Sequence, residues 1–402
     1  MKRSLVIAAM VVGAVASTRA QEPVGSPMQS FSYASGWMFT PAMGFGETYD
    51  DNIALFGVTS GATTSGDVVQ TWLPGADLHY SGRHSEFGLG YSGSFLNYQT
   101  FSTLNRWSQH GRLMFRRQES AHLKWSGHAN VLAVPSTDFI DVGGVPFRRT
   151  GAVTSDGRGS VEYLFNGRDS IILQGAFQTV HFEEPLTVDN ILYGGHVYEA
   201  GGGWHHRLNS RLSAGTDYSF RRALVVGSIE PFDLHSVESG VGYALSPSWS
   251  LDASGGLVFM AATSVAQSRV GPAWHVALER HREARTLRVE YLRSYMPSFG
   301  FGGTVRDEEI TLAFHTPLFH SRRFYTEQRV MYRDDVPLTT EFQQLPLRSL
   351  RTYSMIGWAP QNWVRIEGFY ARTQQTNRLA FGQLYRNRVG FQIVTSKPMR
   401  MQ

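Results

Sequence analysis

Residues 269–293 read RVGPAWHVALERHREARTLRVEYLR, two runs of alternating apolar and polar residues joined by one short turn. The first run has its large apolar residues at one parity, and Glu279 has the other; these apolar residues are Val270, Trp274, Val276 and Leu278. In the second run Val289 alternates with Arg288 in the same way. Residues two apart lie on the same face of a β-strand, so each run predicts a strand with one apolar and one charged face.

The same unit recurs from Gly36 to Thr395, in runs of roughly 10 to 15 residues closed by turn residues. Beyond the N-terminus no stretch of about 18 apolar residues occurs, so the sequence excludes membrane-spanning helices. A soluble β-sandwich or β-helix would bury many charged side chains, each at a cost of several kcal/mol. The pattern therefore predicts a transmembrane antiparallel up-and-down β-barrel with an apolar exterior and a water-filled lumen.

Connections of two kinds alternate along the chain. Eight are tight, and they lie at residues 81–84, 119–120, 166–169, 208–210, 246–248, 282–283, 319–321 and 360–362. Nine are looser, near residues 50–66, 99–105, 135–152, 184–194, 224–232, 263–267, 297–304, 334–346 and 376–383. Seventeen connections require eighteen strands, with sixteen as the alternative count. Short turns are expected in the periplasm and longer loops outside the cell.

The two ends of the chain lie outside the predicted barrel of residues 36–395. Lys2 and Arg3, the apolar run 5–16 and a small-x-small site ending at Ala20 are typical of a secretory signal peptide over residues 1–20. A membrane anchor is the weaker alternative, because the apolar run is short. We expect residues 21–35 to form a short periplasmic segment, residues 396–402 to form a polar tail, and the mature protein to lie in the bacterial outer membrane.

The composition agrees with an outer-membrane β-barrel and argues against a nucleic-acid-binding protein, an enzyme or a calcium-binding protein. The 402 residues are 42% hydrophobic and 13% aromatic, with 41 glycines and no cysteine, and the mean hydropathy is -0.23. The net charge of +4 comes from arginines interspersed with acids, so nucleic-acid binding is not expected. The 14 histidines have no accompanying nucleophile motif, and the acids of Asp50-Asp51-Asn52 and Asp334-Asp335 lack the spacing of a calcium loop. We predict no catalytic residue, metal or cofactor.

Arginines are the candidate functional residues, because their planar guanidinium groups suit carboxylate and phosphate oxygens. Those with lumen parity or a place at the mouth are candidates to guide an anionic solute: Arg269, Arg288, Arg333, Arg365, Arg386 and Arg388. Arg293 and Arg372 have lipid parity near the outer rim, where they are candidates to contact lipopolysaccharide phosphates. Salt bridges between neighbouring strands are the alternative role for all of these arginines.

Residues 46–53, GETYDDNI, resemble the first strand and loop of outer-membrane β-barrel proteins of the putative porin type associated with bacterial exopolysaccharide export. The resemblance implies a wide pore for a polysaccharide, possibly an acidic one, with periplasmic export proteins as partners. It implies no functional residue, although Trp363 and Phe369 could stack on sugar rings. A general diffusion porin or nutrient uptake channel is the alternative, and a structural or adhesive barrel is the second alternative. Porins usually fold one long loop into the pore, and no connection here exceeds about 18 residues, which favours a wide or differently gated pore.

Overall fold

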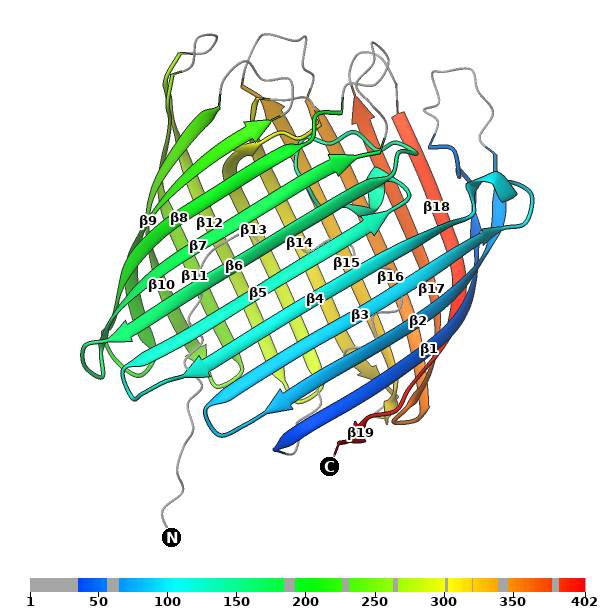
Figure 1. Ribbon diagram of the computed structural model, residues 1–402, viewed down its shortest axis with the longest axis horizontal. Helices are drawn as coiled ribbons and strands as arrows, with labels where there is room; N and C mark the ends of the chain where they lie inside the picture. The colour runs from blue at the N-terminus through cyan, green and yellow to red at the C-terminus, as the bar shows by residue number, and fades with distance from the viewer. Residues whose placement is uncertain are drawn as a thin grey trace.

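The computed structural model describes residues 35–55, 65–183, 192–225, 231–262, 267–300, 303–319, 321–338, 346–377 and 383–401. These residues form eighteen long antiparallel strands that close into one barrel (Figure 1). The prediction of eighteen strands is confirmed. The strands are β1 Gly36–Asp50, β2 Asp67–Ser81, β3 Ser85–Tyr98, β4 Arg106–Gln118, β5 Leu123–Val134, β6 Ala152–Leu164, β7 Asp169–Phe182, β8 Gly195–Arg207, β9 Leu212–Val225, β10 Phe232–Ser246, β11 Trp249–Met260, β12 Arg269–Arg282, β13 Arg285–Pro297, β14 Thr304–Leu318, β15 Ser321–Pro337, β16 Leu347–Gln361, β17 Val364–Asn377 and β18 Gln383–Ser396.

The other elements are short. Two 3₁₀ turns, η2 Ser102–Leu104 and η3 Thr137–Phe139, lie in connections. A two-residue strand, β19 Met399–Arg400, pairs with Met38 and Phe39 of β1 and so extends the sheet into the predicted tail. No helix among the described residues is long and apolar enough to cross a membrane. The expected signal peptide, residues 1–20, and the segment up to residue 34 lie outside the described residues.

The two kinds of connection lie at opposite ends of the barrel, which we call the turn end and the loop end (Figure 1). All eight predicted tight turns lie between the strands where the sequence places them. One boundary is different: β15 continues to Pro337, so Asp334 and Asp335 belong to a strand and not to a loop. An acid can stay in the sheet where a cation on the neighbouring strand balances its charge. Arg348 lies opposite Asp334 in the register in this way.

The GETYDDNI segment closes the barrel where the first strand meets the last. β1 pairs with β18 from Ala42 opposite Ser396 to Asp50 opposite Arg388. Beyond the strand, the Asp51 carboxylate accepts hydrogen bonds from the Asn387 backbone N–H at 2.7 Å and from its side-chain amide at 2.6 Å. The Asn52 amide donates to the Tyr385 carbonyl at 2.8 Å. The short polar motif therefore pairs the terminal strands at the loop end.

The outer face of the barrel is apolar and uncovered. Val270 is 62% exposed, Ile310 49% and Ile393 40%, and their strands lie on different parts of the wall. Exposed tryptophans occur near the turn end, among them Trp204 and Trp358, as an interfacial aromatic belt predicts. Each Å² of apolar surface that is exposed to water costs roughly 25 cal/mol. The apolar outer face therefore fits a bilayer and not bulk solvent.

Candidate functional site in the barrel lumen

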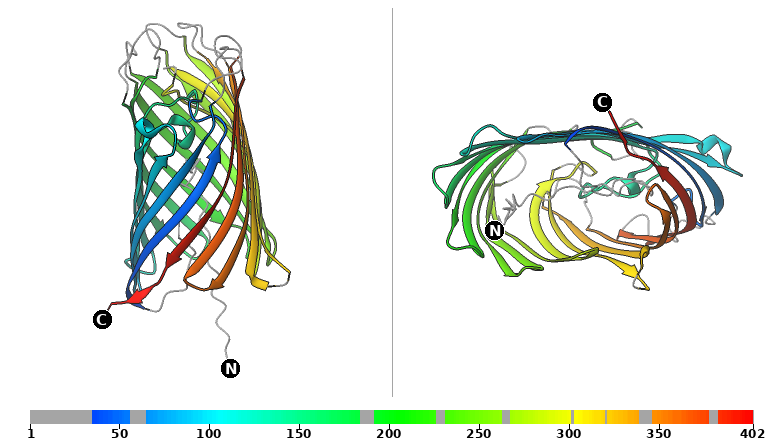
Figure 2. Two further views of the ribbon diagram at one scale, coloured as in Figure 1. Left: turned by 90° about the vertical axis from the view of Figure 1, so that its right-hand side faces the viewer. Right: turned by 90° about the horizontal axis from the view of Figure 1, so that it is seen from below.

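The connection between β5 and β6, residues 135–151, turns into the barrel and is called the lumen loop here. Figure 2 (right) shows this teal segment inside the outline of the wall. Its base is closed by Thr137, whose N–H donates to the Arg148 carbonyl at 3.0 Å. The Thr137 hydroxyl donates to the Pro146 carbonyl at 2.7 Å and accepts from the Arg148 N–H at 2.7 Å. Gly144, with a φ of 68°, supplies the left-handed turn at which the loop reverses.

One side of the lumen loop is apolar and packs on the wall. Ile140 is 1% exposed and Val145 4%. Together with Phe299 they belong to one buried apolar cluster with inward side chains of β5 to β13, namely Leu132, Val134, Ala152, Val180, Phe182, Val197, Ala223, Val225, Phe232, Leu234, Val258, Met260, Ala273 and Tyr295. Each large side chain buried in this way contributes about 1.5–3 kcal/mol. The loop end of the lumen is therefore dry on this side, where the sequence predicted water.

The other side of the lumen loop reaches the opposite wall through charges. Arg386 of β18 pairs with Asp138 of the loop and also holds Asp50 of β1, from Nε to the carboxylate oxygens at 2.9 and 3.1 Å. Arg333 of β15 pairs with Asp141 of the loop at 2.7 Å. All five side chains are less than one-tenth exposed. Two buried ion-pair groups thus tether the loop to β15 and β18.

Hydrogen bonds between the loop backbone and the wall complete the connection. The Gly144 N–H donates to Asp335 at 2.8 Å, and the Phe147 N–H donates to the Gln375 side-chain oxygen at 2.7 Å. Arg351 donates to the Ile140 carbonyl at 3.0 Å and lies over the Phe147 ring at 4.8 Å. The lumen loop therefore spans the barrel from β5 to β18 and narrows it, whereas the short connections in the sequence favoured a wide or differently gated pore.

The six arginines proposed to guide an anion occupy three different environments. Arg333, Arg386 and Arg388 lie inward at the loop end, as parity predicted, and are buried against the lumen loop. Arg269 is exposed at the loop end of β12. Arg288 and Arg365 face the lumen nearer the turn end, where Arg288 pairs with Glu279 and Glu290 and Arg365 lies 3.9 Å from Glu367. The six arginines do not form one site, and a role in guiding an anion stays a prediction for each.

Arg293 and Arg372 lie on the outer face near the loop end. The Arg293 guanidinium lies 5.5 Å from the Trp274 ring centroid and 3.6 Å from Glu308. Arg372 is exposed and lies 5.5 Å over the Tyr385 ring. Both residues therefore have partners on the neighbouring strand, as the salt-bridge alternative suggested for Arg293. Contact with lipopolysaccharide phosphates stays a prediction.

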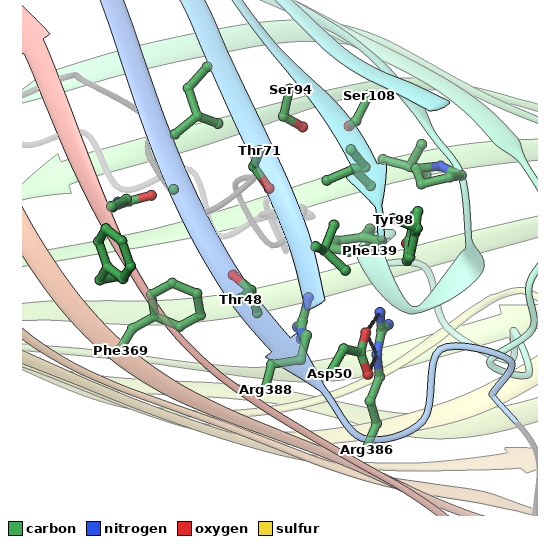
Figure 3. A pocket seen from close by; sticks show the side chains of 18 residues that line it. Thr48, Asp50, Thr71, Ser94, Tyr98, Ser108, Phe139, Phe369, Arg386 and Arg388 are labelled. Atoms are coloured by element: carbon green, nitrogen blue, oxygen red, sulfur yellow. Dashed lines mark hydrogen bonds and ion pairs between the residues drawn. The ribbon is translucent and has the colours of Figure 1, made fainter. Parts of the chain in front are cut away.

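A pocket remains between the lumen loop and the wall formed by β1 to β4, β17 and β18. Its free space is about 770 Å³, including a part open to solvent. Figure 3 shows hydroxyl groups on one side, and Phe139, Phe369 and the inward arginines on the other. Trp363 lies in the turn between β16 and β17, at the other end of the barrel from this pocket.

Towards the turn end the lumen is charged and hydrated. Lys124 at the start of β5 pairs with Glu162 near the end of β6 at 3.1 Å, and Arg112 pairs with Asp77 near the middle of the wall at 3.0 Å. Arg288 keeps 32% of its side chain exposed while it pairs with Glu290 at 2.8 Å. The wet interior that the alternating sequence predicts is therefore present in this half of the lumen.

Sequence reasoning missed Asp138 and Asp141, which anchor the lumen loop. One signal was available: residues 134–147 read VPSTDFIDVGGVPF, which is unusually apolar for a connection between strands. A surface loop is normally polar because its backbone and side chains face water. An apolar connection as long as this one points inward.

The Asp138 carboxylate offers a test of the tether by pH. Burial favours its neutral form, but Arg386, Arg388 and the Ser136 hydroxyl outweigh burial and hold the pKa of Asp138 below its ordinary 3.8. A lowered pKa means that this ion pair stabilises the loop at pH above 3.8, and that the contribution is lost as pH falls through the folded-state value. We expect Asp138→Asn to speed amide hydrogen exchange in residues 138–147 equally at pH 7 and pH 5, measured by mass spectrometry. If the difference in exchange rate between Asp138→Asn and wild type were present at pH 7 but absent at pH 5, the assignment would be contradicted.

The fold and lumen together define an eighteen-stranded barrel with an apolar exterior and a lumen narrowed by an internal loop. No family model and no curated protein matches the chain. Among solved structures it is similar to a BenF-like porin from Pseudomonas fluorescens Pf-5, with 10% identity and a TM-score of 0.45 over 90% of this chain and 99% of that one. It is also similar to Acinetobacter baumannii OccAB4, with 8% identity and a TM-score of 0.46 over 91% and 99%. For Pseudomonas aeruginosa OccK2 (OpdF) the identity is 11% and the TM-score 0.46, over 89% and 98%.

Proposed function

We propose that the protein is a bacterial outer-membrane channel that lets small solutes diffuse across the membrane, with the turn end in the periplasm and the loop end outside. The apolar outer face and the aromatic residues near its edges support the location. The tethered lumen loop is the observation that carries the function. It narrows the loop-end half of the lumen, whereas the turn-end half, called the vestibule here, is lined by charged side chains such as Lys124 and Arg288 that stay about one-third exposed.

This proposal favours the diffusion or uptake reading over polysaccharide export. A polymer of sugar rings needs continuous space through the whole lumen, whereas Ile140 and Val145 lie buried in the loop-end half. Moving the loop aside would break both buried ion-pair groups and expose the apolar cluster, at a cost of several kcal/mol.

A size-exclusion experiment tests the proposed function. In liposomes containing the purified protein, a monosaccharide or an amino acid should enter at a rate that rises with the amount of protein, measured by swelling. A long maltodextrin should not enter. Equal entry of the polymer would favour export, and no entry of any solute would favour a structural barrel. Protein-free liposomes give the background.

A further inference from the structure

Arg388 is a buried cation whose charge no acidic side chain of the described chain neutralises by contact. It lies on β18, faces the lumen and is 7% exposed. Its Nε atom is buried and has no hydrogen-bond acceptor, and the described residues offer its guanidinium no ion pair. Within the described part of the chain its guanidinium lies over the Phe139 ring, 5.1 Å from Cζ to the centroid.

The neighbouring acids are already used. Asp50 and Asp138 both bind Arg386, two residues before Arg388 on the same strand. Figure 3 shows Asp50 turned towards Arg386, while Arg388 extends into the pocket beside Thr48. Asp50, Arg386 and Arg388 are the charged residues of the pocket lining, and Asp138 on the far side of Arg386 brings the group to two acids and two arginines. Arg388 is the member of this group whose guanidinium contacts no carboxylate among the described residues. A buried donor without an acceptor is costly, and a bound carboxylate would supply that acceptor.

The rest of the lining describes the body of such an anion. Phe139, Phe369 and Leu73 provide an apolar surface, and Thr48, Thr71, Ser94 and Ser108 place hydroxyl groups along β1 to β4. An inorganic ion would use the charge but leave the apolar surface without a partner.

We propose that Arg388 and this pocket bind a small organic monoanion, with a carboxylate on the guanidinium and an apolar body against Phe139 and Phe369. The planar fork of arginine suits a carboxylate, and the ring below it holds the fork in place. The inference rests on the proposed function only for the route by which the solute reaches the pocket. Binding itself depends on the pocket alone.

Calorimetry on the folded full-length barrel in detergent tests the site, with phenylacetate as the probe. Wild type should bind phenylacetate more tightly than acetate, which lacks the ring, and more tightly than phenylacetamide, which lacks the charge. Arg388→Gln should weaken phenylacetate binding at least tenfold, with Arg388→Lys in between because it keeps the charge but loses the fork. Arg372→Gln, on the outer face, is the matched control and should bind as wild type does.

Wild-type affinity in Arg388→Gln, with the variant folded by its heat-modifiable electrophoretic mobility, would overturn the assignment. Equal affinity for acetate and phenylacetate would overturn the apolar part of it. The liposome experiment separates the two proposals. Arg388-dependent binding without solute entry would leave the site standing and remove the channel. Solute entry without phenylacetate binding would leave the channel and remove the site.

Discussion

Excision of Asp138–Phe147 is expected to raise the single-channel conductance several-fold. Thr137 and Arg148 already face each other, with the Thr137 N–H 3.0 Å from the Arg148 carbonyl, so a two-glycine linker can join them as a tight hairpin. The excised residues are those that cross the lumen and meet β15 and β18. Without them the hydrated turn-end vestibule would continue to the loop end. Conductance in planar bilayers measures the result.

Because excision also uncovers the apolar cluster, a second variant keeps the loop and weakens its tether. Asp138→Asn with Asp141→Asn removes both loop carboxylates from their arginines and should increase the frequency of high-conductance openings. Asp334→Asn is the matched control, since Asp334 pairs at 3.2 Å with Arg348, whose side chain is 48% exposed. Wild-type conductance in both the excision and the double variant, each folded, would show that the lumen loop does not limit the pore.

The wall of the barrel could be predicted almost completely from the sequence. Its alternation survives in every strand because one face meets lipid and the other meets the lumen, so a shift by one residue would reverse both. The tight turns could be predicted equally well. For example, the turn predicted at Asn166-Gly167-Arg168-Asp169 connects β6 and β7. These signals are local, and they need no knowledge of distant residues.

The contents of the lumen could not be predicted in the same way, because they depend on contacts between residues far apart in the chain. Arg386 was assigned to the lumen by parity, but its partner Asp138 lies 248 positions earlier. The loose connection predicted at 334–346 placed Asp334 and Asp335 in a loop, since nothing local shows that Gly144 donates to Asp335 from across the barrel. Lumen parity identifies which side chains face inward, and the fold of the loop decides whether they meet water.

Arg386→Met is expected to lower the free energy of unfolding by about 3–5 kcal/mol. The arginine is 2% exposed and holds two carboxylates that are equally buried, Asp50 at 2% and Asp138 at 0%. Methionine matches much of its volume but leaves both acids, on β1 and on the lumen loop, without the cation that contacts them. The substitution should therefore loosen the junction of β1 with β18 and the tether of the loop together. Urea unfolding in lipid vesicles, followed by tryptophan fluorescence, measures the loss.

The loss of stability comes mainly from leaving Asp50 and Asp138 buried and unpaired. The net stabilisation by the intact ion pairs contributes less. Replacing a whole buried ionic group by neutral residues is often close to neutral, because the cost of desolvating the charges disappears with them. Arg386→Met combined with Asp50→Asn and Asp138→Asn should therefore recover most of the stability, while Arg372→Met on the outer face should change it by about 0.5 kcal/mol or less. If the single variant were as stable as the triple variant, water would have to reach Asp50 and Asp138, and the loop end of the lumen would be wetter than their burial indicates.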